Sequence, residues 1–321
     1  MKQGNTIVLP LLIRKILLKY SDDTHNVSLP MIQKYLEEDG ISADRRTIYN
    51  AIHAINETGD LVALHRNRSD GGYHIDHPIT KEEAFLLLNI LDESTALTEE
   101  EYSSLREKIL SLISIPAQKD LPNTHITEHC IETPILPILR ILLDAIASLH
   151  PVEFLYYDLS LSKTKNYRKD KKIYHLVPYA IVSRNGKFYC IFYSEKHHSF
   201  ANYRLDKMDH VQICEEIAVP VHFSLVDHLR TSFQMYHGSA QTITGEFHIN
   251  LANAVLDEFG DNLLISKVNQ DTFTASIRTA ITPTLIGWLL QYYDQIHISY
   301  PKELKEKLLH IASHIQKEYQ E

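Results

Sequence analysis

The chain has 321 residues, 44% hydrophobic and 23% charged, so it is long enough for two or three domains with buried cores. A net charge of −9 means that any contact with nucleic acid depends on a local basic patch. The three cysteines, Cys130, Cys190 and Cys214, are widely separated, which argues against a disulfide framework or a zinc site and fits a reducing cytoplasm.

The apolar patch at 7–18 is interrupted by Arg14 and Lys15 and is followed by no small-residue cleavage site, so we expect neither a signal peptide nor a membrane span. Among the 19 histidines, His310 and His314 share a helix face, but no third ligand is near in sequence. We therefore favour an exposed helix over a metal site there.

Residues 1–78 predict three helices and a hairpin. Pro10 suits the first turn of the first helix, Gly40 ends the second, and Ser42 is a plausible N-cap of the third. Strands are expected at 61–65 and 73–75, around a glycine-rich tip. This order is typical of a winged helix-turn-helix DNA-binding domain.

The third helix has an apolar stripe of Ile48, Ile52 and Ile55, and its opposite face is polar. Arginine pairs with guanine and asparagine with adenine in the major groove, while wing arginines suit phosphates or the minor groove. A winged helix used for protein contact is the alternative. The candidate DNA-binding residues are Arg45, Arg46, Thr47, Tyr49, Asn50 and His53, with Arg66 and Arg68 on the wing.

Residues 79–137 predict a helical linker. Capping boxes start two helices, Thr80 with Glu83 and Thr98 with Glu101, and 114–137 lacks periodicity. The pair of helices suits either a dimerising or signal-transmitting hinge or a hairpin packed on the winged helix.

Residues 138–215 predict a helix followed by a small β-barrel or sandwich, because the run at 188–193 has no polar face. Asn185-Gly186 marks a tight hairpin. The loop 160–172 carries six basic residues and suits either a solvated tip or a basic lip for an anion. The expected helix is 138–149, and the expected strands are 152–157, 176–183, 188–193 and 202–207.

Residues 216–321 predict a small α+β domain of mixed short elements. Strands are expected at 242–250, 272–278 and 295–299, and helices at 252–259, at 283–291 around Trp288 and after Pro301.

The segment 173–213 resembles the WYL domain of bacterial transcriptional regulators. A Pro-Tyr strand, a turn glycine, Phe188-Tyr189-Cys190 in place of the eponymous Trp-Tyr-Leu, and Tyr-Arg-Leu-Asp-Lys at 203–207 carry the resemblance. The third N-terminal helix is similar to the recognition helix of these regulators, although Asn50 stands where an acidic residue is common. The C-terminal part resembles their extension domain, so the resemblance covers nearly the whole chain.

The resemblance implies a small SH3/Sm-like barrel with an effector site, often for single-stranded nucleic acid or a nucleotide-like ligand. Cations and hydroxyl groups would bind phosphate, and aromatic faces would stack on a base. Lys207 stands where the family usually has arginine and loses its bidentate geometry. Alternatively, the tyrosines are core residues and Arg204 pairs with Asp206 or another carboxylate. The candidate effector-binding residues are Tyr156, His175, Ser183, Tyr193, Tyr203, Arg204 and Lys207.

No catalytic motif is present, so we expect neither an enzyme nor a cofactor or metal site. The interpretation is a cytoplasmic bacterial regulator that binds a double-stranded operator, with a homodimer implied by the resemblance. The alternative is a WYL accessory protein that binds single-stranded nucleic acid without an operator.

Overall fold

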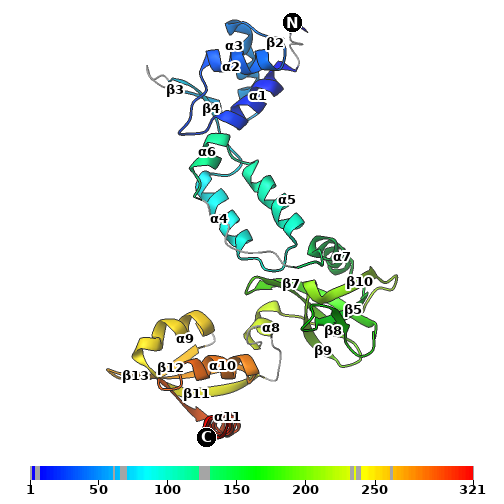
Figure 1. Cartoon of the computed structure of the whole chain (residues 1–321), viewed down its shortest axis with the longest axis vertical. Coiled ribbons are helices and arrows are strands. Elements are labelled where there is room, and N and C mark those ends of the chain that lie inside the picture. Colours follow the sequence, from blue (N-terminus) through cyan, green and yellow to red (C-terminus); the bar gives the residue numbers. More distant parts are fainter. Residues whose placement is uncertain are drawn as a thin grey trace. The chain divides into compact units, whose positions relative to one another are not determined.

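The computed structural model describes residues 2–3, 8–60, 62–65, 71–122, 131–231, 235, 240–260 and 263–320. The chain forms two compact units, Met1–Pro134 and Ile135–Glu321 (Figure 1). Each unit has a core of its own. Within the described ranges, no helix has the length and apolar character needed to cross a membrane.

The first unit begins with three helices and a two-stranded antiparallel sheet, in the order that the sequence predicts. Ile13, Leu17, Ile32 and Ile48 are fully buried in a core that these elements share. A two-residue parallel pairing adds β1 to β2. The elements are β1 (Lys2–Gln3), α1 (Leu9–Tyr20), α2 (Leu29–Glu38), β2 (Ile41–Ser42), α3 (Arg45–Glu57), β3 (Val62–His65) and β4 (Gly72–Ile75).

Helix α3 buries the predicted apolar stripe, but its N-cap differs from the prediction. The carboxylate of Asp44 accepts a hydrogen bond from the backbone N–H of Thr47 at 2.8 Å. Ser42 instead lies in β2, opposite Gln3. Both residue types are good N-caps, so composition alone does not distinguish them.

Strand β4 runs close to the loop before α2. Val27 and Tyr73 exchange backbone hydrogen bonds of 2.8 and 2.9 Å. A Cβ atom added to Gly72 would lie 2.6 Å from the carbonyl oxygen of Val27, so glycine permits this close approach.

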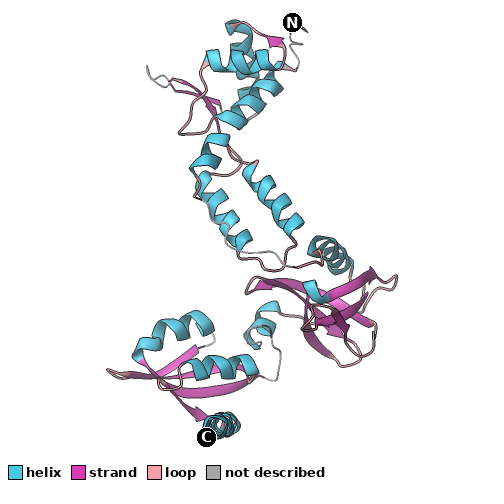
Figure 2. Ribbon diagram, viewed as in Figure 1, coloured by secondary structure: helices cyan, strands magenta, loops and turns pink. Residues whose placement is uncertain are grey.

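Helices α4 (Lys81–Asp92) and α5 (Glu99–Leu110) form an antiparallel-looking pair in Figure 2, and each begins with the predicted capping box. A short helix, α6 (Ile115–Asp120), lies within the segment expected as a linker. Its N-cap is Ser114, whose hydroxyl oxygen accepts from the N–H of Ala117 at 3.0 Å. A helix of this length is too short to show periodicity in the sequence.

Asp22 connects α6 to the loop after α1. It is 7% exposed, and its carboxylate accepts hydrogen bonds from the Ser114 hydroxyl and from the N–H groups of Thr24 and His25 at 2.9 and 2.8 Å. Burial alone would raise the pKa of Asp22, but the hydrogen bonds outweigh it and hold the pKa well below its ordinary value.

In the second unit, a strongly curled antiparallel sheet forms a half-barrel. Its strand order is β10-β5-β7-β8-β9, and β6 pairs with the far end of β5. Its elements are α7 (Ile135–Ser148), β5 (Val152–Leu159), β6 (Lys165–Tyr167), β7 (Tyr174–Arg184), β8 (Lys187–Ser194), β9 (Ser199–Arg204), the 3-10 turn η1 (Leu205–Lys207) and β10 (Met208–Ile213).

The predicted hairpin between β7 and β8 is confirmed. Asn185 and Gly186 have φ angles of 50° and 67°, as a two-residue primed turn requires. Cys190, Ile191 and Phe192 in β8 are fully buried on both faces of the strand. The strand predicted at 202–207 is wrong at its end, because η1 replaces its last three residues.

The C-terminal part has a four-stranded sheet of order β12-β13-β11-β14, with helices packed against it. Strand β12 is absent from the sequence prediction, since its residues show no alternation of apolar and polar side chains, and five of the six are exposed in the structure. On α11, His310 and His314 are exposed, as expected. The elements are α8 (Leu225–Thr231), β11 (Ala240–His248), η2 (Ile249–Leu251), α9 (Ala252–Phe259), β12 (Leu263–Val268), β13 (Thr272–Ala280), α10 (Pro283–Gln291), β14 (Ile296–Tyr300) and α11 (Lys302–Tyr319).

We expect Asp22→Asn to lower the free energy of unfolding by about 1–2 kcal/mol near neutral pH, because an amide accepts these hydrogen bonds more weakly than a carboxylate. The folded pKa of Asp22 lies below its ordinary value of 3.8, so its contribution is complete above 3.8 and is lost as the pH falls through the folded value. Urea unfolding followed by circular dichroism, at neutral pH and below about pH 4, measures the difference. A difference that does not shrink with acid would contradict this role.

Candidate functional site

The exposed face of α3 carries the candidate DNA-binding side chains. Arg45, Arg46, Tyr49, Asn50 and His53 are all exposed, opposite the buried apolar stripe. The structure therefore places a row of guanidinium, aromatic, amide and imidazole groups on one accessible helix face.

Of the other members of the predicted set, the structure describes only Thr47. Thr47 is half-buried at the start of α3. The wing residues Arg66 and Arg68 lie outside the described residues. His53 has Glu57 as a neighbour one turn on, with Nδ1 and Oε1 3.4 Å apart.

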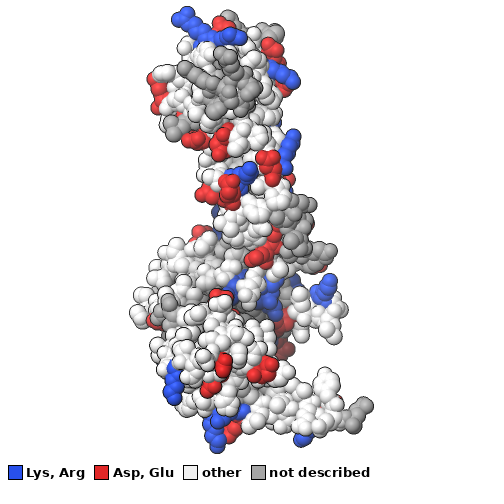
Figure 3. All heavy atoms as spheres, turned by 90° about the vertical axis from the view of Figure 1, so that its left-hand side faces the viewer, with Lys and Arg blue, Asp and Glu red and all other residues white. Residues whose placement is uncertain are grey.

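Basic and acidic side chains are interspersed over the face of the molecule drawn in Figure 3. This mixed distribution agrees with the net charge of −9. Any contact with nucleic acid would therefore depend on a local basic patch and not on the charge of the whole chain.

In the second unit, aromatic rings from β5, β7, β8 and β9 pack together around Tyr203. The Tyr203 ring centroid lies 5.5 Å from that of Phe154, 5.0 Å from Tyr156, 5.5 Å from Tyr174 and 5.6 Å from Phe192. Burial raises the pKa of Tyr156 to about 12. The predicted Tyr156 and Tyr203 are therefore part of one ring cluster, and Tyr156 is a buried member of it.

Arg204 is paired with Asp206, which is the alternative that the sequence left open. Arg204 Nε and Nη2 donate to the two carboxylate oxygens of Asp206 at 2.9 and 2.6 Å. The Asp206 side chain is only 5% exposed, and Lys187 Nζ lies 4.0 Å from it. The backbone N–H of Arg204 also donates to the Tyr156 hydroxyl at 3.1 Å.

Lys207 belongs to a second charged cluster, centred on Asp158. Lys207 Nζ donates to Asp158 at 2.7 Å, and Arg168 Nε donates to its other oxygen at 2.6 Å. The hydrogen bonds from Arg168 and Lys207 lower the pKa of Asp158 to about 2. Two of the predicted effector cations, Arg204 and Lys207, thus bind carboxylates of the domain itself.

A groove beside these clusters brings together three of the predicted residues, His175, Tyr193 and Tyr203. Its volume is about 410 Å³. Ser183 is not among its lining residues; it is exposed near the far end of β7, opposite Phe188.

The groove also has a basic wall that the candidate residues did not include. Lys169 and Lys172 come from the charged loop, and Lys196 comes from the turn between β8 and β9. Lys169 Nζ lies 5.9 Å from the centre of the Tyr174 ring, which also lines the groove. Two lysines of the loop, Lys169 and Lys172, therefore line the groove, whereas Lys165 and Arg168 pair with Asp209 and Asp158.

The first unit has a cavity of about 390 Å³ between α6 and the loops around α1 and β4. Asp22, Asp23, Asp76 and Glu82 are among its lining residues. This concentration of carboxylates is unfavourable for a phosphate-containing ligand.

Residues 137–213 match the family model of the WYL domain, so the predicted WYL domain is confirmed for this segment. No protein of curated function is significantly similar to the chain. Among solved structures, the proteasome accessory factor B/C (PafBC) of Arthrobacter aurescens is similar at 15% identity and a TM-score of 0.29, with 95% of this chain and 46% of that chain covered. A CRISPR Cas-related protein is similar at 12% identity and a TM-score of 0.26, with 100% and 94% covered. The chain thus spans just under half the length of the first of these proteins.

We expect Arg204→Ala to lower the free energy of unfolding of the second unit by about 1–3 kcal/mol, because it leaves the Asp206 carboxylate buried without its bidentate partner. The double variant Arg204→Ala/Asp206→Asn removes the uncompensated charge and should recover part of the loss. Urea unfolding of the two variants and the wild type measures both effects. Equal stability of all three proteins would show that the pair does not support the fold.

Proposed function

We propose that this chain is a DNA-binding transcriptional regulator whose WYL domain binds a nucleotide or single-stranded nucleic-acid effector that changes operator affinity. The exposed face of α3 is the observation that carries the first half of this proposal. The WYL match and the basic, aromatic groove support the second half. The proposed action is binding, not catalysis.

For operator binding, α3 would enter the major groove of duplex DNA. Arg45 and Arg46 at the start of the helix suit guanine edges or phosphates, and Asn50 one turn on suits adenine. The buried stripe of Ile48, Ile52 and Ile55 anchors α3 to the core of its domain. The two arginines and the asparagine are therefore held in a fixed orientation on the exposed face of the helix. A homodimer that reads two half-sites is part of the proposal.

For the effector, the groove is a better candidate than Arg204 and Lys207. Tyr174, Tyr193 and Tyr203 line the groove and would stack on bases, and the lysines of the basic wall would bind phosphates. Because Arg204 supports the buried Asp206 carboxylate, removing it would confuse loss of binding with loss of stability. Lys169 and Lys172 are exposed, so they can be changed at little structural cost.

A second candidate function is a WYL accessory protein that binds single-stranded nucleic acid and has no operator. The same groove supports it, because base stacking on aromatic rings and lysine contacts to phosphates do not require a particular sequence. Whether the chain enriches a duplex sequence distinguishes the two functions.

Selection from a random duplex library by the purified chain should enrich an inverted repeat, because two copies of α3 would read equivalent half-sites. The variant Arg45→Ala/Arg46→Ala should lose this enrichment. The matched control Lys302→Ala/Lys305→Ala removes the same charge from α11 and should keep it. If no duplex is enriched, or if both variants behave alike, operator reading by α3 is wrong.

Binding of a single-stranded oligonucleotide should weaken in Lys169→Ala/Lys172→Ala. Loss of two phosphate contacts should reduce the slope of log K against log salt by about 1.4, since each contact contributes about 0.7 on single strands. Affinity measured by fluorescence anisotropy over a range of salt concentrations gives the slope. The control Lys302→Ala/Lys305→Ala should leave it unchanged, and an unchanged slope in the groove variant would exclude these lysines.

A further inference from the structure

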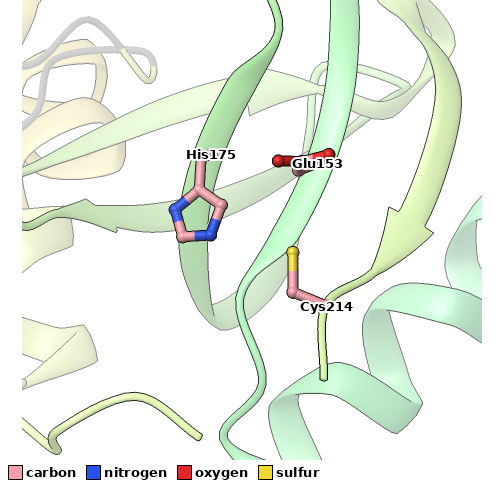
Figure 4. A group of neighbouring side chains, drawn as sticks. All are labelled: Glu153, His175 and Cys214. Carbon is pink, nitrogen blue, oxygen red and sulfur yellow. The ribbon is translucent and has the colours of Figure 1, made fainter. Parts of the chain in front are cut away.

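Three potential metal ligands that are widely separated in sequence meet at the edge of the WYL domain. Glu153 on β5 and His175 on β7 are direct partners in the antiparallel ladder. Cys214 comes directly after β10, whose Ile213 is opposite Val152 of β5. A carboxylate oxygen, an imidazole nitrogen and the sulfur of these three side chains all lie within 4.8 Å of one another (Figure 4).

The backbone around Cys214 is held on both sides. Its N–H donates to the carbonyl oxygen of Pro151 at 2.9 Å, and its own carbonyl oxygen lies 2.9 Å from His150 Nδ1. Further along, the N–H of Ala218 donates to the carbonyl oxygen of Leu149 at 2.9 Å. The thiol is therefore presented from a fixed segment, as a preorganised binding site requires.

Glu216 contacts His175 but does not join the three converging ligands. Glu216 Oε1 lies 2.6 Å from His175 Nε2. An exposed pair of this kind contributes little to stability. This pair explains why Glu216 lies beside His175. It does not explain why the side chains of Glu153 and Cys214 also lie next to the same imidazole.

We propose that Glu153, His175 and Cys214 bind a divalent zinc-like transition-metal ion, with Glu216 holding the His175 ring in place through its hydrogen bond. Thiolate, imidazole and carboxylate are the donors that zinc takes in proteins, and a thiolate selects against magnesium and calcium. Ligand atoms in a tetrahedral zinc site lie roughly 3.3–3.6 Å apart. Small side-chain rotations bring donors within 4.8 Å to that separation.

The charges of the site balance. On binding, the Cys214 thiol releases its proton to solvent and ligates as a thiolate, while the imidazole ligates in its neutral form. The thiolate and the Glu153 carboxylate then neutralise the doubly charged cation. No oxidation or reduction is involved.

The absence of a CxxC pair argues against a zinc site only when the cysteines supply most of the ligands. Here the ligands come from β5, β7 and the end of β10, which only the folded sheet brings together. A bound ion would attach the segment after β10, where the chain leaves the WYL domain, to β5 and β7 of the sheet. It would also fix the ring of His175, which lines the groove. This site does not depend on the proposed regulatory function.

Cobalt(II) is the probe that tests the site, because a thiolate ligand gives it a near-ultraviolet charge-transfer band. The full chain with Cys130→Ser, whose remaining thiols are Cys190 and Cys214, should bind one equivalent of Co²⁺ with this band. Zinc should displace the cobalt and remove the band. Adding Cys214→Ser should abolish it, whereas Cys190→Ser should keep it, since Cys190 is fully buried.

The other residues of the site are tested in the same background. His175→Ala, Glu153→Gln and Glu216→Gln should each weaken Co²⁺ binding at least about tenfold, whereas His310→Ala on α11 should not. Circular dichroism checks that each variant is folded. No thiolate band in the starting protein, or a band unchanged by Cys214→Ser, would overturn the site, and unchanged affinity in Glu216→Gln would overturn its role in positioning His175.

Discussion

The half-barrel depends on how η1 is attached to β5. Asp206 lies in this turn with its carboxylate buried and bound by Arg204 at 2.9 and 2.6 Å. The Tyr157 hydroxyl donates to the carbonyl oxygen of Asp206 at 2.8 Å, and the Tyr156 hydroxyl accepts from the N–H of Arg204 at 3.1 Å. These contacts connect the end of β9 to β5 and so complete the curl of the sheet, because η1 and not a ladder joins its two edge strands.

The basic residues of the domain have two different roles. Arg204, Lys207 and Arg168 neutralise Asp206 and Asp158 and so stabilise the fold. Across the described residues, no ion pair with a carboxylate involves Lys169, Lys172 or Lys196, the three lysines beside the aromatic groove. A phosphate-containing ligand would therefore bind the lysines of the groove without first breaking the internal ion pairs.

The features that could be predicted from the sequence are those determined by residues close together in the chain. The stripe on α3, the capping boxes and the turn at Asn185-Gly186 depend on neighbours in the chain, and the structure contains them. The candidate effector residues were chosen by type and strand, and only part of that set shares the groove. The sequence left the pairing of Arg204 with Asp206 open as an alternative, because side-chain direction decides it. The meeting of Glu153, His175 and Cys214 depends on sheet register, which composition does not specify.

Photo-crosslinking of a single-stranded oligonucleotide to the full chain tests the groove most directly, because crosslinks form at residues that touch the bases. Mass spectrometry of the digested adducts then identifies the crosslinked positions. The account predicts adducts at Tyr174, Tyr193 or Tyr203, the rings that line the groove. Adducts confined to α3 or to the C-terminal sheet, with none on these rings, would contradict it.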